Sequence, residues 1–147
     1  MKQTDLDVKS SVEFNDLDED HKCIFNYIDK LQDIVNKPND HEYSVVILEG
    51  FIANFLEHVI KEEQLLLQYL PVSVVDEHTV LHQTELAYLD ESLHTLKCDL
   101  SAENIQIIVD NLKQEFRRHV YRYDRNIMQK VIEAKKLRLT NFTTFRD

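Results

Sequence analysis

The chain is almost without the residues that make tight turns, since its 147 residues include one Gly and two Pro. Hairpins between β-strands depend on Gly, Asn or Asp at turn positions with positive φ, so this composition disfavours a sheet. Strong helix formers such as Leu, Ile, Glu, Lys and Gln are abundant instead. The sequence therefore predicts an all-α fold, in one domain because this length leaves no room for a second.

Four amphipathic segments follow one another along the chain, near residues 18–37, 41–70, 74–98 and 102–136. Each has apolar residues at the three- and four-residue spacing of one helix face. Pro38 and Pro71 stand where the first and second segments end, and Ser101 is a suitable N-cap for the fourth. Short connections make neighbouring helices run in opposite directions, so the sequence predicts an up-and-down antiparallel four-helix bundle with a short C-terminal extension.

The same pattern divides the chain into three parts, namely an N-terminal arm (1–17), the bundle (18–136) and a C-terminal tail or connector (137–147). The arm is polar and acidic. The basic stretch 135–138 leads into the tail, which would suit a connector to a larger protein.

Charge and apolar content narrow the classes of partner. Lys and Arg number 17 against 27 Asp and Glu, a net charge of −10, which disfavours nucleic acid because phosphate binding needs a basic surface. No apolar run approaches the roughly 20 residues of a membrane span, so no membrane partner is expected. Cys23 and Cys98 have no CxxC spacing and are expected to stay reduced, as in a cytoplasmic chain.

Seven polar residues share the inward faces of the four segments with the apolar residues. They are His21, His58, Glu62, His78, His82, His119 and Asp124. A single histidine on an apolar face is usually a satisfied core residue. Seven converging groups, however, would bury two carboxylates at a cost of several kcal/mol each unless positive charge lies between them. Metal cations supply such charge, so the sequence predicts a dinuclear metal site.

The spacing within each pair fits this site with one exception. Residues four apart, such as His58 and Glu62, lie about 40° apart around a helix and reach one metal from adjacent turns. Asp124 follows His119 by five residues, about 140° on a regular helix. We therefore hypothesise a local widening of the π type between His119 and Asp124, which would bring both side chains inward.

Four other residues of the same types are set apart from the predicted ligands. His41 and His94 have no carboxylate partner in the pattern and are expected at the surface. Glu63 and Glu85 are alternative ligands, although Glu63 lies about 100° from the direction of Glu62 and is expected to face water.

The ordered set H…HxxxE…HxxxH…HxxxxD resembles the hemerythrin family over about residues 18–124. The sequence around His21, Leu17-Asp18-Glu19-Asp20-His21-Lys22, is similar to the bacterial members, the bacteriohemerythrins. The resemblance implies an up-and-down four-helix bundle with a non-haem di-iron centre. It also implies that Phe116, three residues before His119, lies near an oxygen pocket.

Ligand counting gives a coordination scheme for two non-haem irons. Glu62 and Asp124 would bridge them together with one oxo or hydroxo oxygen, and five histidines would divide as three and two. One iron is then six-coordinate, and the other keeps one position open for a small ligand. The resemblance implies that the closed iron is held by His78, His82 and His119 and that the open iron is held by His21 and His58. Dioxygen would bind at the open position.

Reversible binding of dioxygen by an oxygen carrier, store or sensor is the function expected from this site, rather than enzymatic turnover. Two alternatives stay open: a di-iron oxidoreductase acting on peroxide or nitric oxide, and a regulatory iron- or oxygen-sensing module of a larger signalling protein. The histidine-rich set differs from the carboxylate-rich sites with Glu-x-x-His spacing of ferritin-like di-iron proteins. A structural zinc site is the least favoured interpretation of these seven residues, because such sites use four ligands. The sequence does not indicate an oligomeric state or a protein partner.

Overall fold

The structure is a computed structural model that describes residues 4–146, with side chains described in 19–121 and 124–139. Its elements in chain order are α1 (Thr4–Val35), a 3₁₀ turn η1 (Pro38–Asp40), α2 (Tyr43–Tyr69), α3 (Val72–Cys98), α4 (Ala102–Arg118), a π-helical segment η2 (His119–Asp124) and α5 (Arg125–Arg146). The described residues form no strand. The predicted all-α fold is confirmed.

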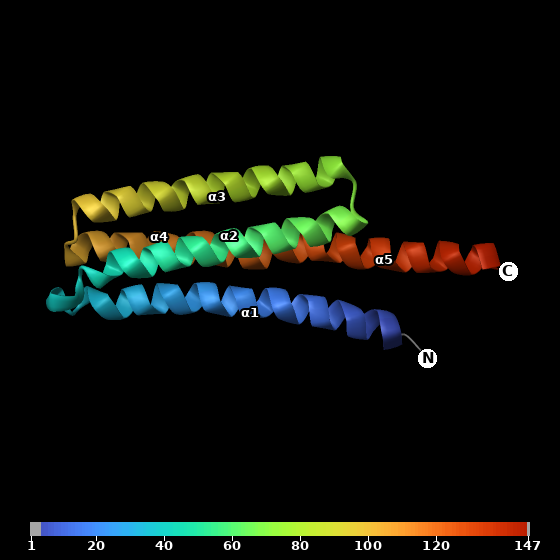
Figure 1. Cartoon of the computed structure of the whole chain (residues 1–147), viewed down its shortest axis with the longest axis horizontal. Coiled ribbons are helices and arrows are strands. Elements are labelled where there is room, and N and C mark those ends of the chain that lie inside the picture. The colour runs from blue at the N-terminus through green and yellow to red at the C-terminus, as the bar shows by residue number, and fades with distance from the viewer. Residues whose placement is uncertain (1–3, 147) are drawn as a thin grey trace.

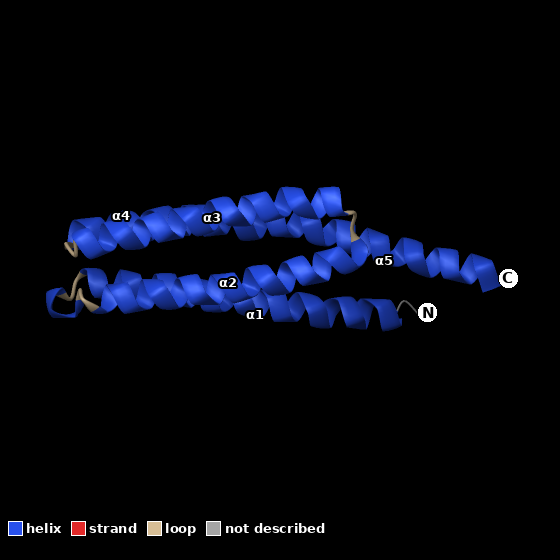
Figure 2. Cartoon of the chain, turned by 45° about the horizontal axis from the view of Figure 1, so that its top comes forward, coloured by secondary structure: helices blue, strands red, loops and turns tan. Residues whose placement is uncertain are grey.

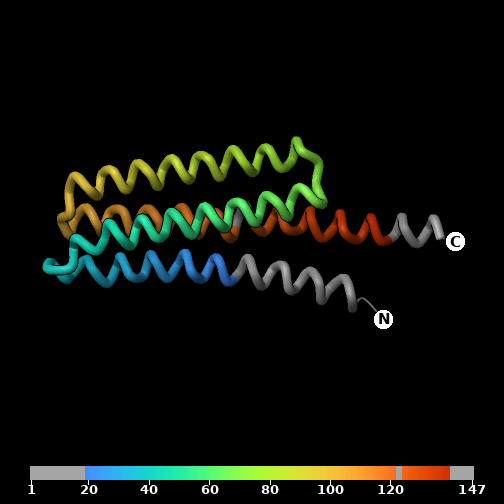
Figure 3. Tube along the Cα trace, in the orientation of Figure 1, coloured from blue at the N-terminus to red at the C-terminus, as the bar shows by residue number. Residues whose placement is uncertain are grey.

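The helices form an up-and-down antiparallel bundle, as predicted (Figure 1). The helix α1 packs against α2 and α4, and α3 lies beside α2 and α4. The segments α4, η2 and α5 continue one another and act as a single fourth helix (Figure 2). The Cα trace shows the short connections that reverse the chain at each end of the bundle (Figure 3).

Two helix boundaries differ from those expected. The first helix begins at Thr4 rather than near residue 18, and the last continues to Arg146 rather than ending near residue 136. Much of the stretch expected as an N-terminal arm and most of the expected tail therefore have a helical backbone. Helix propensity explains the difference, because a helix continues along the chain when no Pro or Gly stops it. The three-part division of the chain itself stays a prediction.

The helix ends follow the local signals in the sequence. Ser101 caps α4, since its side chain accepts a hydrogen bond from the Asn104 backbone N–H at 3.2 Å. Pro38 begins the 3₁₀ turn after α1, and Pro71 precedes the first residue of α3. These breaks bring each helix back alongside its predecessor and fix which residues of adjacent helices meet.

A polar layer divides the apolar core of the bundle into two clusters. The larger cluster fills the end of the bundle near η1 and includes Ile28, Leu48, Phe51, Leu89 and Leu112. The smaller cluster consists of Leu66, Val75, Ile127, Met128 and Val131 on α2, α3 and α5. On α3 and the fourth helix the predicted ligands fall between the two clusters in sequence, and on α2 they flank Val59 at the edge of the larger cluster.

Within the described residues, α2 alone is long and apolar enough to meet the length and hydropathy criteria of a membrane span. About a third of its most apolar window is buried inside the bundle (33%), and the helix also contains buried His58 and Glu62. The core helix of a bundle passes the same test, so this property is weak evidence for a membrane span.

Candidate metal centre

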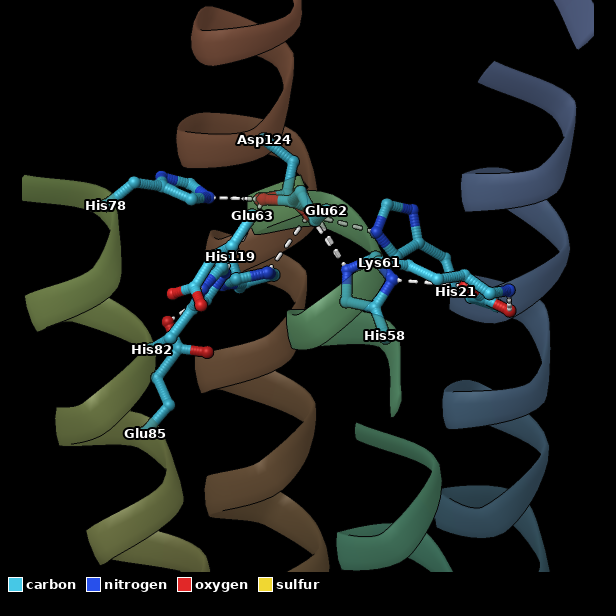
Figure 4. Close-up of polar contacts among 11 residues, drawn as sticks. His21, His58, Lys61, Glu62, Glu63, His78, His82, Glu85, His119 and Asp124 are labelled. Carbon is cyan, nitrogen blue, oxygen red and sulfur yellow. Dashed lines mark hydrogen bonds and ion pairs between the residues drawn. The ribbon is translucent and has the colours of Figure 1, made fainter. Parts of the chain in front are cut away.

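The structure brings all seven predicted ligands together in the polar layer (Figure 4). All seven are buried. They come from four elements: α1 contributes His21, α2 contributes His58 and Glu62, α3 contributes His78 and His82, and η2 contributes His119 and Asp124. Of the other two histidines, His94 is exposed as expected. His41 is half-buried and donates a hydrogen bond to the Val35 carbonyl at 3.0 Å, outside this group.

The π-type widening expected between His119 and Asp124 is present. The segment His119–Asp124 is π-helical, while the residues before and after it are α-helical. One extra residue in this turn removes the 140° offset, so that His119 Nε2 lies 3.0 Å from Asp124 Oδ2. The irregular turn thus places two polar side chains in the centre of the bundle.

Asp124 is one of two carboxylates around which the histidines gather. Its Oδ2 lies 2.9 Å from His21 Nε2 and 3.6 Å from His58 Nε2. Its Oδ1 lies 3.2 Å from His78 Nε2. Asp124 therefore faces histidines of three other helices.

Glu62 is the second such carboxylate. Its Oε2 lies 3.0 Å from His58 Nε2, while its Oε1 contacts His78 Nε2 and lies 3.5 Å from His82 Nε2. Every predicted histidine thus presents Nε2 to Glu62 or Asp124. One nitrogen of the same kind from each ring faces a shared centre, which is the arrangement of metal-binding histidines.

Two groups of four residues have ligand atoms close enough to hold one metal ion each, with all atoms of a group within 4.8 Å of one another. One group is His21, His58, Glu62 and Asp124; the other is Glu62, His78, His82 and Asp124. Both groups contain Glu62 and Asp124. His119 belongs to neither group, but its ring centroid lies nearer to that of His82 (5.3 Å) than to that of His58 (6.2 Å).

The inward nitrogen and oxygen atoms are placed to bind cations rather than to hydrogen-bond with one another. His58 Nε2 and Glu62 Oε2 lie 3.0 Å apart, yet neither has a hydrogen-bond partner, because proximity here lacks hydrogen-bond alignment. The same holds for three further inward atoms, namely His82 Nε2, His119 Nε2 and Asp124 Oδ1. Buried polar atoms without partners are costly, and an ion between them would satisfy them.

Comparison with known protein families matches residues 12–131 to the family described as the hemerythrin HHE cation binding domain. The match covers most of the chain and includes all seven residues. The chain belongs to the hemerythrin family. No curated protein and no solved structure matched it. The buried cluster of the hemerythrin domain can thus hold a metal ion, as the family description implies.

Charge within the hemerythrin domain is balanced between carboxylates and histidines. Burial alone would lower the pKa of His58, but the negatively charged carboxylates of Asp124 and Glu62 beside its Nε2 raise the pKa to about 9. His78 is subject to the same two effects, and there too the carboxylates outweigh burial and raise the pKa to about 9. Burial likewise opposes protonation of His119, yet Asp124 and Glu85 raise its pKa to about 10.

The two carboxylates shift in the opposite direction. Burial and the charge of Asp124 act to raise the pKa of Glu62, but the close approach of His58, His78 and His82 holds the pKa well below its usual range. Burial also acts to raise the pKa of Asp124, but the histidines around it outweigh burial and hold the pKa well below its usual range. Both carboxylates are therefore ionised and need positive charge, which comes from protons on histidines or from metal ions.

Three more carboxylates lie behind the histidines, on the side away from the centre. The Nδ1 atoms of His58, His82 and His119 contact Asp20 (3.4 Å), Glu63 (3.2 Å) and Glu85 (2.8 Å) respectively. Glu63 and Glu85, considered as alternative ligands, instead lie against the outer nitrogens. Asp20 was missed, because no helical spacing links it to His58, 38 residues away.

An apolar layer closes the centre on the side of the larger cluster. The ring centroid of Phe55 lies 6.2 Å from that of His58, 6.1 Å from that of His82 and 5.7 Å from that of His119. Phe116, expected near an oxygen pocket, lies in this layer and packs edge-on against Phe55 (5.0 Å). Phe55, which sequence reasoning did not single out as a neighbour of the site, contacts three of the histidines, whereas Phe116 contacts His119.

Two openings reach the centre from outside. A groove of about 690 Å³ lies between α1 and the η2–α5 part of the fourth helix, and His21 and Asp124 form part of its wall. The rest of its lining mixes apolar side chains with the cations Lys22 and Arg125. A smaller opening of about 340 Å³ lies between α3 and α5 and reaches His78.

Proposed function

We propose that this hemerythrin domain holds two iron ions and binds dioxygen reversibly, as an oxygen carrier, store or sensor. One observation carries the proposal: two ligand groups, each sufficient for one metal ion, share Glu62 and Asp124. Two carboxylates common to both groups fit bridges between two cations, whereas a single ion would leave part of the seven-residue set unused.

The remaining ligands divide unequally between the two positions. His21 and His58 complete one group, while His78 and His82 complete the other, with His119 nearest to His82 among the ligand rings. We assign His119 to the second position on this distance. An iron held by two histidines and the two shared carboxylates would have room for a small ligand, and iron in its reduced form would supply the electrons for binding dioxygen.

The protein controls access to this open position from two sides. The groove between α1 and α5 ends at His21 and Asp124, beside the two-histidine group, and gives a small molecule a path from solvent. On the opposite side, Phe55 and Phe116 pack against the histidines and exclude water. Because water is excluded on that side, bound dioxygen is released unchanged rather than lost in side reactions with water.

Anaerobic reconstitution tests the proposal. Protein loaded with Fe(II) and desalted should contain close to two irons per chain, and aeration should produce an optical charge-transfer band that disappears on deoxygenation. The same protein loaded with Zn(II) is the control and should show no band. One iron per chain, or a band that persists after deoxygenation through repeated cycles, would contradict reversible binding at a di-iron site.

The groove that ends at His21 and Asp124 is compatible with a second candidate function. It admits peroxide and nitric oxide as readily as dioxygen, because the three molecules are of similar size. A di-iron oxidoreductase acting on peroxide or nitric oxide is therefore the alternative. Consumption of peroxide or nitric oxide by the iron-loaded protein over many turnovers, and not by the Zn(II)-loaded control, would favour it over reversible binding.

A further inference from the structure

The three carboxylates behind the ligand histidines differ in burial. The side chain of Glu85 is 7% exposed, while those of Glu63 and Asp20 are 23% and 25% exposed. Glu85 also makes the shortest contact, at 2.8 Å from His119 Nδ1. A charge in a poorly solvated position acts more strongly on its neighbour than one that water screens.

The charge of Glu85, unlike that of Asp20, is not offset by a neighbouring cation among the described residues. Asp20 lies within 3.1–3.2 Å of Lys61 Nζ, so a cation offsets its charge. Glu85 Oε1 accepts from His119, while its Oε2 has no hydrogen-bond partner. The negative charge of Glu85 is thus directed at one ligand histidine.

We propose that Glu85 is a positioning residue that makes His119 a stronger electron donor than the other ligand histidines and so lowers the reduction potential of the metal ion it holds. A carboxylate that accepts the outer N–H of an imidazole fixes the ring and raises its basicity. A more basic ligand stabilises the metal ion more after it loses an electron than before. The inference rests on the proposed iron site and adds that the two irons are unequal in potential.

The position of Glu85 explains how one residue can act on the metal without touching it. Glu85 lies on α3, one turn after His82, and its carboxylate crosses to His119 on the fourth helix. It therefore also fixes α3 against η2 at the level of the metal centre. This structural role must be separated from the electronic one.

Two substitutions separate the two roles. Glu85→Gln keeps the size and an acceptor oxygen but removes the charge, and Glu85→Asp keeps the charge on a shorter side chain. Spectroelectrochemical titration of the iron-loaded proteins should give a higher midpoint potential for Glu85→Gln than for the parent, and Glu85→Asp should recover part of the difference. Glu91→Gln, an exposed glutamate on the same helix, is the matched control and should leave the potential unchanged. Equal potentials in Glu85→Gln and the parent would overturn the proposal.

A comparison with the better-solvated carboxylate adds a second criterion. Glu63→Gln should raise the potential less than Glu85→Gln, because water already screens Glu63. We also expect Glu85→Gln to weaken metal binding by about 10- to 100-fold, the usual effect of losing such a partner. Equal shifts of potential in the two variants would overturn the proposal.

A measurement without any substitution covers the case in which Glu85→Gln fails to fold or to load. In the diamagnetic Zn(II) form of the parent, the Nδ1 proton of His119 should resonate at the lowest field among the ligand histidines, because its hydrogen bond is the shortest and most buried. A His119 proton no further downfield than that of His82 would overturn the inference. Iron content and the dioxygen band, recorded separately, show whether the proposed function itself has failed.

Discussion

Glu62 and Asp124 carry the charge that organises the centre. Both are buried, and each faces Nε2 atoms from more than one helix. In the metal-free protein, protons on the histidines balance these two charges; in a loaded protein, metal ions would replace the protons. Stability and metal binding are therefore coupled at these two side chains.

Removal of Glu62 should abolish the proposed dinuclear site. Glu62→Ala takes away one of two residues common to both ligand groups and leaves positive charges facing one another. We expect metal analysis to find at most one iron per chain. Glu57→Ala, at an exposed position on the same helix, is the control and should retain two. Two irons held by Glu62→Ala with the affinity of the parent would contradict a bridging role.

Metal loading should release protons in a pH-dependent way. The pKa values of His58, His78 and His119 are raised from 6.5 to about 9, 9 and 10, so their protonation stabilises the metal-free fold below pH 6.5 and this contribution is lost as the pH rises through 9–10. Metal ions must displace those protons, and affinity should fall as the pH falls below about 9.

Calorimetric titration with Zn(II) in buffers of different ionisation enthalpy measures this release. Near pH 8, loading should free up to about three protons from these histidines, and near pH 9 fewer, because the pKa values of about 9 and 10 are then partly passed. The Glu62→Ala variant is the control and should release fewer protons at pH 8. A release that stays constant between these two pH values would show that the histidines are already neutral in the metal-free protein.

The π-helical segment decides whether the fourth helix can supply two ligands. A π turn is an α-helix with one extra residue, so removal of one residue within it restores a regular helix and leaves both flanking parts in register. His119 and Asp124 would then be four residues apart, a spacing that also keeps both side chains on one face.

Deletion of Tyr121, an exposed residue inside η2, should therefore be tolerated. We expect the variant to retain two metal ions and to unfold at a temperature no lower than the parent, because the irregular turn is removed. Circular dichroism and metal analysis check this outcome.

Deletion of Gln114, an exposed residue one turn before the π segment, is the matched control. Removal of a residue there rotates Phe116 and His119 by about 100° relative to the helix before them. This variant should lose metal and stability. If both deletions lost metal equally, the π segment would have a role beyond register.

Seen as a whole, the bundle closes its polar centre on one side and leaves it open to solvent on another. The larger apolar cluster closes the centre around Phe55, whereas α1 and α5 leave a groove that reaches His21 and Asp124. The groove gives a molecule from solvent a path to the side of the centre where His21 and Asp124 lie.

Narrowing the groove should slow the binding of dioxygen. Gln129 is exposed and lines the groove, so Gln129→Trp adds bulk there without removing core contacts. We expect stopped-flow mixing of the reduced iron protein with dioxygen to show slower association, with two irons retained. Gln83→Trp, at an exposed position on α3 that does not line the groove, is the control. Equal association rates in the two variants would mean that dioxygen enters by another path.

Helix periodicity and spacing were enough to predict the bundle, its capping at Ser101, the seven converging residues and the π segment. Each of these depends on contacts within a few residues along one helix or on which face a residue occupies, and both are encoded locally. The resemblance to hemerythrins rested on the same spacings, and the family match confirmed it.

Contacts between distant segments were decided only by the tertiary structure. Asp20 lies behind His58, Glu85 lies behind His119 and a groove opens beside His21, and each depends on how helices far apart in sequence are rotated and splayed. The helix α1 also continues back to Thr4, beyond the packed face that periodicity identified. Local spacing determines the inward face of a helix, but packing between helices determines what stands behind each inward residue.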